Sequence, residues 1–210
     1  MKDIIIVGAG GFGRELLQWI KDINRIESKW KIKGFLDDNL NALYGYECDY
    51  EIIGKISEWV PNKDEVFACA IAEPKVKEKV ITLLKEKDAV FEKIIHPTAI
   101  IGSFNKIGEG FVAYPHSGIA VNTKIGNFVT LLRSGVGHDV KIGNYTTISS
   151  HCDLTGHVEI GSRVFVGSHA TIIPNCIIGN NVYIGAGSVV IRNVKENKKV
   201  FGNPARNFEI

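Results

Sequence analysis

The chain has 210 residues, 45% of them hydrophobic and 23% charged, with a formal net charge of +2 at neutral pH. This length suits one large domain or two small ones, and the lack of a basic block argues against binding to nucleic acid or an anionic membrane. No apolar run reaches membrane-spanning length, and Ile4–Val7 is too short for the core of a signal peptide, so we expect a cytoplasmic protein. The four cysteines form no CxxC pair, which favours reduced thiols over a structural zinc site.

The first 95 residues alternate between apolar runs and segments with helical periodicity. Strands are expected at Ile4–Val7, Ile32–Leu36, Glu65–Ile71 and Ala89–Ile95, and helices at Arg14–Ile26 and from Pro74 to about Lys87. Strands separated by helices predict a small parallel sheet. Residues 1–95 are therefore interpreted as a Rossmann-like α/β domain, which ends where His96-Pro97 breaks the pattern.

A glycine-rich segment, Gly8-Ala9-Gly10-Gly11-Phe12-Gly13, follows the first strand and opens the first helix. Its G-x-G-x-x-G spacing lets the backbone approach a phosphate at the positive end of a helix. Asp37 ends the second strand, where an acidic side chain can meet a ribose hydroxyl. A dinucleotide needs two such halves, and 95 residues supply only one. We therefore expect a nucleotide diphosphate bound by Gly8, Gly10, Gly11, Gly13 and Asp37, with a merely structural glycine turn as the alternative.

From Ile101 onward, an apolar and mostly branched residue recurs at every sixth position. The series runs from Ile101 to Leu131, with Ala113 as its exception, and resumes from Ile142 to Val190. Glycine often follows the apolar residue and helps the chain to turn a corner. This period predicts a left-handed parallel β-helix over residues 96–210, in which three six-residue faces make one coil and about five coils fit between residues 101 and 190.

The repeat slips back by one residue between Leu131 and Ile142. One interpretation is a tolerated loop deletion. The other is that the turn is reshaped to aim His138 outward, since departures from a strict pattern are enriched at functional sites.

Stacking by eighteen residues places His138 one rung from Gly156, and Asp139 above His157 and Asn175. A histidine beside a free backbone N–H suits acyl transfer. The imidazole of His138 can take a proton from a nucleophile, and the N–H of Gly156 can hold charge on a thioester oxygen. Asp139 is then the residue that orients the imidazole.

Three other histidines indicate a ridge of stacked side chains along the β-helix. His151 and His169 are eighteen residues apart, and with allowance for the slip Arg133 and His116 fall in line with them. This ridge is expected either to line a cleft for a phosphate-bearing ligand or to be exposed without function. A metal site of three histidines shared between subunits is the alternative on this fold, but no clear set of three is evident and no metal is expected.

These motifs resemble the bacterial hexapeptide-repeat acyltransferases, in the group of sialic-acid O-acetyltransferases and nucleotide-amino-sugar N-acetyltransferases. The resemblance covers nearly the whole chain. Its motifs are Ile5–Gly13, Gly34–Asp38, His96–Ala99, Gly137–Gly143 and Gly202–Ala205. The Gly-His-Asp segment and the final Gly-Asn-Pro-Ala are fairly specific for this group. The six-residue repeats, or hexads, also occur in nucleotidyltransferases and carbonic anhydrases.

The resemblance implies an acetyl-CoA donor in a groove between neighbouring prisms of a homotrimer, and a nucleotide-sugar bound by the N-terminal domain. It implies that His138 is the general base, supported by Asp139, and that an amine attacks the thioester directly without an acyl-enzyme. The residues it places along CoA are Gly156, Gly167, Ser168, Ala186, Gly202, Asn203 and Pro204.

Two positions depart from the family pattern. Relatives often carry a second histidine nine residues after the base, where this chain has Thr147. They also often have Asn-Thr before the His-Asp pair, where this chain has Leu131–Ser134. Arg133 is therefore a candidate for contact with a charged group of the substrate.

The sequence thus favours transfer of acetyl from acetyl-CoA to the amine of a nucleotide-linked amino sugar, in surface glycan synthesis. The alternatives are O-acetylation of a sugar such as sialic acid, a trimeric metal-dependent hydratase like the carbonic anhydrases, and a non-enzymatic binding or scaffold role.

Overall fold

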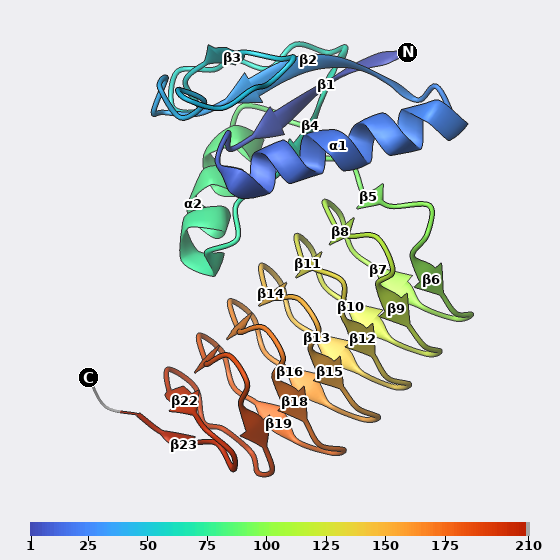
Figure 1. The fold of residues 1–210 in the computed structure, drawn as a ribbon, viewed down its shortest axis with the longest axis vertical. Coiled ribbons are helices and arrows are strands. Elements are labelled where there is room, and N and C mark those ends of the chain that lie inside the picture. The colour runs from blue at the N-terminus through green and yellow to red at the C-terminus, as the bar shows by residue number, and fades with distance from the viewer. Residues whose placement is uncertain (209–210) are drawn as a thin grey trace. The chain divides into compact units, whose positions relative to one another are not determined.

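The computed structural model describes residues 1–208. The chain divides into two compact units, with the boundary between Pro97 and Thr98 (Figure 1). No helix among the described residues is long and apolar enough to cross a membrane.

The first unit holds a parallel four-stranded sheet in the order β3-β2-β1-β4. Its strands are β1 (Lys2–Val7), β2 (Trp30–Leu36), β3 (Ile52–Gly54) and β4 (Glu65–Cys69), and its helices are α1 (Gly11–Ile26) and α2 (Pro74–Lys85). Strand β1 lies between two neighbours, so Ile4–Val7 is fully buried, as a continuous apolar run predicts. Helix α1 buries the stripe that includes Leu16, Leu17 and Ile20. The predicted α/β arrangement is confirmed.

The prediction differs from the structure at two strands. The strand expected over Ala89–Ile95 is wrong: the chain forms an isolated bridge between Phe67 and Phe91, then the two-residue strand β5 (Ile94–Ile95). The alternate side chains of Ala89 and Phe91 are buried there without a continuing ladder, and apolar content reports burial rather than pairing. Strand β3 was not expected, because it is short and only half-buried.

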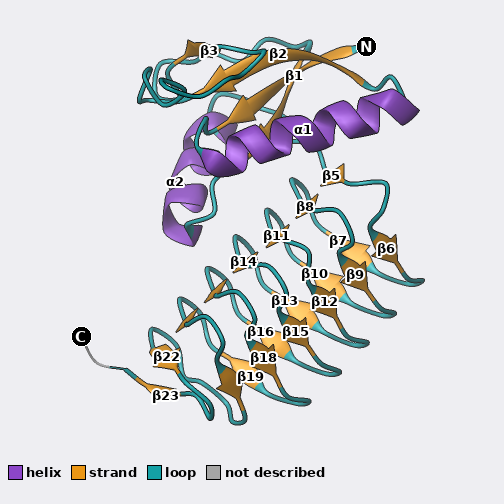
Figure 2. Cartoon of the chain, in the orientation of Figure 1, coloured by secondary structure: helices purple, strands orange, loops and turns teal. Residues whose placement is uncertain are grey.

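The second unit is a parallel β-solenoid whose coils each contribute one strand to three sheets (Figure 2). The first sheet contains β6 (Ile100–Ile101), β9 (Gly118–Ile119), β12 (Gly135–Val136), β15 (Asp153–Leu154), β18 (Thr171–Ile172) and β21 (Val189–Val190). The second sheet contains β7 (Lys106–Ile107), β10 (Lys124–Ile125), β13 (Lys141–Ile142), β16 (Glu159–Ile160) and β19 (Ile177–Ile178). The third sheet contains β8 (Val112–Ala113), β11 (Thr130–Leu131), β14 (Thr147–Ile148), β17 (Phe165–Val166), β20 (Tyr183–Ile184), β22 (Lys199–Phe201) and β23 (Arg206–Asn207).

The second residue of most of these strands points into the solenoid, so that the hexad residues form its core. Leu131, Ile148 and Ile184 are fully buried, and Ala113 is buried where the series lacks a branched residue. The β-helix of hexapeptide repeats predicted from the period of six is confirmed.

From Phe104 to Gly187, each corner of the solenoid places one residue in the left-handed backbone region. These residues form three ridges along the solenoid. Ridge 1 follows the first sheet and carries Phe104, Asn122, Asp139, His157 and Asn175. Ridge 2 follows the second sheet and carries Gly110, Phe128, Tyr145, Arg163, Asn181 and Asn197. Ridge 3 follows the third sheet and carries His116, Arg133, His151, His169 and Gly187.

The slip in the repeat is a single short corner on ridge 3. Left-handed residues are six apart elsewhere from Phe104 to Gly187, but Phe128 and Arg133 are only five apart. Gly118 therefore pairs with Gly135 (135 − 118 = 17), whereas Gly135 pairs with Asp153 (153 − 135 = 18). The turn that holds His138 has ordinary length. The interpretation that the slip reshapes this turn is wrong, since the deletion lies in the preceding corner.

Candidate active site

His138 and Asp139 form a hydrogen-bonded pair at the surface of ridge 1. The His138 Nδ1 lies 2.8 Å from the Asp139 Oδ2, and the two side chains are 56% and 40% exposed. Asp139 tolerates its φ of 59°, and its N–H donates to the carbonyl of Val121 on the preceding coil. Since a carboxylate only accepts, the Nδ1 donates and leaves the Nε2 of the neutral ring as the proton acceptor.

Gly156 lies directly beneath the imidazole of His138, as stacking by eighteen residues predicts. A Cβ at position 156 would lie 2.6 Å from both the Cε1 and the Nε2 of that ring. Such an approach is below van der Waals contact, so any larger residue would displace the ring. The absence of a side chain thus lets the proton-accepting nitrogen lie against the backbone of the next coil.

The N–H of Gly156 has no acceptor among the residues that the structure describes. On ridge 2, the equivalent N–H groups donate to side chains on the next coil: Glu109 to Asn127, Asn127 to Asn144, Asn144 to Ser162, and Ser162 to Asn180. The residue below Gly156 is Pro174, whose side chain offers no oxygen. The site therefore presents a free donor beside a base.

His157 lies on the coil below Asp139. Its ring is T-shaped to that of His138, with centroids 5.0 Å apart, and its Nε2 lies 3.9 Å from the Asp139 Oδ2. The spacing of eighteen residues predicts that His157 lies below Asp139, but it predicts no functional role for His157.

A shallow groove on the first sheet reaches the same corner. It has a volume of about 380 Å³ and is lined by residues that include Gly118, Gly135, Gly137 and Asp153. Gly118 and Gly135 occupy outward positions without a side chain, which hollows the face next to His138.

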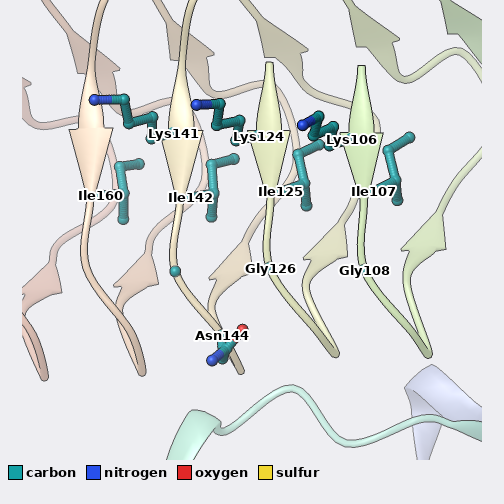
Figure 3. A pocket seen from close by; sticks show the side chains of 11 residues that line it. Lys106, Ile107, Gly108, Lys124, Ile125, Gly126, Lys141, Ile142, Asn144 and Ile160 are labelled. Carbon is teal, nitrogen blue, oxygen red and sulfur yellow. The ribbon is translucent and has the colours of Figure 1, made fainter. Parts of the chain in front are cut away.

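A second groove, of about 520 Å³, lies on the second sheet and contains none of the predicted catalytic residues. Figure 3 shows Lys106, Lys124 and Lys141 side by side on successive strands of this sheet. The Lys141 Nζ lies 2.6 Å from the Glu159 Oε1 on the neighbouring strand. We assign this groove no part in the chemistry at His138.

Ridge 3 holds the aligned residues His116, Arg133, His151 and His169, as predicted. The rings of His151 and His169 are stacked with centroids 5.0 Å apart. Ridges 1 and 3 border the first sheet at opposite edges, so Arg133 and His138 are separated by β12 within one chain.

Within a single chain, the residues expected along CoA lie on different ridges of the solenoid and do not form one site. Gly156 lies on ridge 1, whereas Gly167, Ser168 and Ala186 lie on ridge 3. A Cβ at Gly167 would lie 2.5 Å from the backbone nitrogen of Ala186, so Gly167 is required by close stacking of the coils.

The segment Gly202, Asn203 and Pro204 follows β22 and is exposed. Its first residue is tied to the end of the first sheet, because the carbonyl of Gly202 accepts from Val189 and its N–H donates to the Ser188 Oγ.

The glycine loop of the first unit contains two kinds of glycine. Gly8 has a φ of 102°, and a Cβ at Gly13 would lie 2.0 Å from the carbonyl oxygen of Gly8, so the fold requires both. A Cβ at Gly10 would meet nothing within 4 Å, and one at Gly11 would reach only the Arg14 side chain at 4.0 Å. The open side of the loop is thus at the N-terminus of α1.

Asp37 is bound to the glycine loop itself. Its Oδ2 accepts from the N–H of Ala9 at 2.8 Å, and its Oδ1 accepts from the N–H of Asn39 at 2.9 Å. The carboxylate therefore ties the end of β2 to the loop, a contact that the sequence did not predict.

Comparisons with known proteins agree with this organisation. Residues 3–84 match the model of the PglD N-terminal domain, and residues 157–192 match that of the bacterial transferase hexapeptide with six repeats. The UDP-N-acetylbacillosamine N-acetyltransferase of Bacillus subtilis (strain 168) is 30% identical over 116 residues, which are 53% of this chain and 51% of the relative. The chain thus spans about half the length of this relative, and it spans 24% of another, the uncharacterized protein L142 of Acanthamoeba polyphaga mimivirus.

Two solved structures share the fold along their whole length. WeeI from Acinetobacter baumannii AYE is 29% identical with a TM-score of 0.87, and the alignment covers 99% of this chain and 100% of WeeI. PerB from Caulobacter crescentus, solved in complex with CoA and GDP-perosamine, is 21% identical with a TM-score of 0.89 and coverage of 100% and 98%. From its two domain matches and the fold it shares with WeeI, the chain combines a region similar to the PglD N-terminal domain with bacterial transferase hexapeptide repeats.

Proposed function

We propose that the protein transfers an acetyl group from acetyl-CoA to the amine of a nucleotide-linked amino sugar. The observation that carries this proposal is the position of the His138 imidazole, which is held by Asp139 and lies over Gly156 with its free N–H. A base and an oxyanion donor one rung apart are the two groups that aminolysis of a thioester requires.

In the proposed reaction, the amine nitrogen attacks the thioester carbonyl carbon. The Nε2 of His138 takes the proton from the amine, and the N–H of Gly156 donates to the oxygen on which charge develops. The carbon–sulfur bond then breaks, and the CoA thiolate leaves and recovers the proton from the imidazolium. Asp139 stabilises the imidazolium during this sequence. No side chain becomes acylated.

The sugar's nucleotide is assigned to the glycine loop. The open space at Gly10 and Gly11 leaves room for a diphosphate at the N-terminus of α1, where N–H groups and the helix dipole favour an anion. Gly8 and Gly13 shape the loop, and Asp37 secures it through Ala9. We keep Arg133 as a candidate for contact with a charged group of the substrate, supplied from ridge 3.

The separation of ridges 1 and 3 supports an assembly in which neighbouring chains complete the site. We infer a homotrimer in which acetyl-CoA lies between prisms, against Gly156 of one chain and Gly167, Ser168 and Ala186 of the next. Gly202, Asn203 and Pro204 are then assigned to the nucleotide end of CoA.

The names of similar proteins favour an amine over a hydroxyl acceptor. The Bacillus relative is named for N-acetylation of a UDP-sugar, and PerB was solved with CoA and a GDP-linked amino sugar.

The test is turnover of the wild type and of His138→Asn with a panel of UDP-, GDP-, CMP- and dTDP-linked 4-amino sugars, followed by release of the CoA thiol. Loss of the base is expected to lower kcat by about 10²- to 10⁴-fold. His116→Asn, an exposed histidine on ridge 3, is the matched control and should retain turnover. Full turnover by His138→Asn would overturn the mechanism, and acetylation of free sialic acid in place of the panel would redirect the proposal to O-transfer.

A further inference from the structure

His138, Asp139 and His157 place two imidazole nitrogens and one carboxylate oxygen within 4.8 Å of one another. The three residues come from two consecutive coils of ridge 1, where stacking fixes their backbones. Their side chains are 56%, 40% and 56% exposed, so an ion can reach them from solvent. We propose that this cluster binds a divalent transition metal ion such as Zn²⁺, and that the bound ion inhibits the enzyme.

The donor set selects the class of metal. Two imidazoles and one carboxylate suit Zn²⁺ and its neighbours, whereas Mg²⁺ and Ca²⁺ prefer oxygen ligands alone. Ligands at tetrahedral positions around Zn²⁺ are about 3.3 Å apart, given bond lengths near 2.0 Å. The Nδ1 of His138 and the Oδ2 of Asp139 are 2.8 Å apart, and the Nε2 of His157 is 3.9 Å from that oxygen. A small rotation of half-exposed side chains closes the set, with water in the fourth position.

Inhibition follows from the tautomer that the ion imposes. An ion on the Nδ1 of His138 takes the lone pair of that atom, so the proton of the neutral ring resides on the Nε2. The Nε2 is the atom that must accept a proton from the amine. The ion also replaces the hydrogen bond to Asp139. Metal binding and proton acceptance by His138 are therefore mutually exclusive. The inhibition rests on the proposed function, but the binding of the ion does not.

The other histidine pair of the solenoid is the matched comparison. His151 and His169 stack at the same centroid distance, 5.0 Å, as His138 and His157. Among the described residues, neither belongs to a group of three possible metal ligands. The carboxylate of Asp139 thus distinguishes the two pairs.

Zinc binding is measured by isothermal titration calorimetry on the intact, tag-free protein in a non-coordinating buffer. The wild type is expected to bind one Zn²⁺ per chain. His157→Asn should weaken the affinity by at least about tenfold, since even outer-shell changes cost 10- to 100-fold. His169→Asn should leave the affinity unchanged. Equal affinities of the wild type and His157→Asn, or no binding by the wild type, would overturn the site.

Inhibition is measured separately, as acetyl transfer at increasing Zn²⁺ with each variant normalised to its own rate in EDTA. The wild type and His169→Asn should lose turnover reversibly, and the inhibitory concentration should rise at least tenfold in His157→Asn. Zinc binding without any inhibition of turnover would overturn the regulatory part. Zinc binding by a protein that acetylates no sugar would instead overturn the proposed function and leave the metal site standing.

Discussion

Glycine is required at position 156 because of its neighbour His138, and not because of its own backbone conformation. Its φ does not lie in the left-handed region, so the backbone alone would accept another residue. The requirement comes from His138, whose ring occupies the place of a Cβ.

Gly156→Ala is therefore expected to push the imidazole away from its position. A misplacement of about 1 Å costs about 10²-fold in turnover, so kcat should fall by that order. The melting temperature should change little, because position 156 is only half-buried and lies outside the solenoid core. Turnover kinetics beside a thermal melt check this, and an unchanged kcat would show that the ring is not held over Gly156 during the reaction.

Lys77 is a buried cation in the first unit. It is 1% exposed on α2, and burial lowers its pKa to about 8, although Cys69 and Glu73 oppose the shift. Between pH 8 and 10.5 the unfolded lysine keeps its proton while the folded one has lost it. The unfolded state then binds more protons, so stability rises with pH across this window.

Lys77→Met should remove this dependence. Relative to the variant, the wild type should gain up to about 3 kcal/mol of unfolding free energy as the pH rises from 8 to 10.5. Urea unfolding at several pH values measures the difference, and Lys79→Met, at an exposed site on the same helix, should run parallel to the wild type. Parallel curves for Lys77→Met and the wild type would contradict the assignment.

At the scale of elements, the glycine loop depends on a carboxylate at the end of another strand. Asp37→Ala removes the acceptor for the N–H groups of Ala9 and Asn39. We expect the dissociation constant of the nucleotide-sugar to rise by about tenfold, since hydrogen bonds to a charged group contribute about 1.5–3 kcal/mol each.

Calorimetry with the nucleotide-sugar and with acetyl-CoA checks this, because only the former should change. Asp38→Ala is the matched control: Asp38 also accepts two hydrogen bonds, but both come from Ser57. An equal loss of acetyl-CoA affinity in Asp37→Ala would indicate general damage to the fold.

The secondary-structure elements could be predicted where the sequence repeats with one period over many residues. The hexads fixed the core of the solenoid and the stacking of His138 on Gly156, because each coil repeats the constraint of the last. The Ala89–Ile95 segment has no such repetition, and its buried Phe91 forms one bridge instead of a ladder.

Parts of the site depend on contacts that spacing does not encode. The slip was predicted only to lie between Leu131 and Ile142, although Val136, six residues before Ile142, fits the second register and is buried. Likewise, the bond from Ala9 to Asp37 depends on the relative placement of two strand ends.

At the scale of the whole molecule, the split between ridges 1 and 3 has a consequence for mixed assemblies. A chain with His138→Ala keeps ridge 3 intact, and a chain with Ala186→Arg keeps ridge 1 intact. If neighbouring chains share each site, mixed trimers contain some interfaces in which both contributing ridges are wild type.

Co-expression of the two inactive variants should therefore restore turnover. Random pairing gives one intact interface in about four, so about a quarter of wild-type activity is expected. Simple mixing of the separately purified variants without subunit exchange is the control. Activity that stays at background in verified mixed trimers would place the whole site within one chain.

The division of the chain between Pro97 and Thr98 also places all of its tryptophans on one side. All three tryptophans, Trp19, Trp30 and Trp59, belong to the first unit, and residues 98–210 contain none. Indole emission therefore reports on the unfolding of the domain that holds the glycine loop. Paired with circular dichroism, it resolves whether the two halves melt as one cooperative body or in succession, without any label.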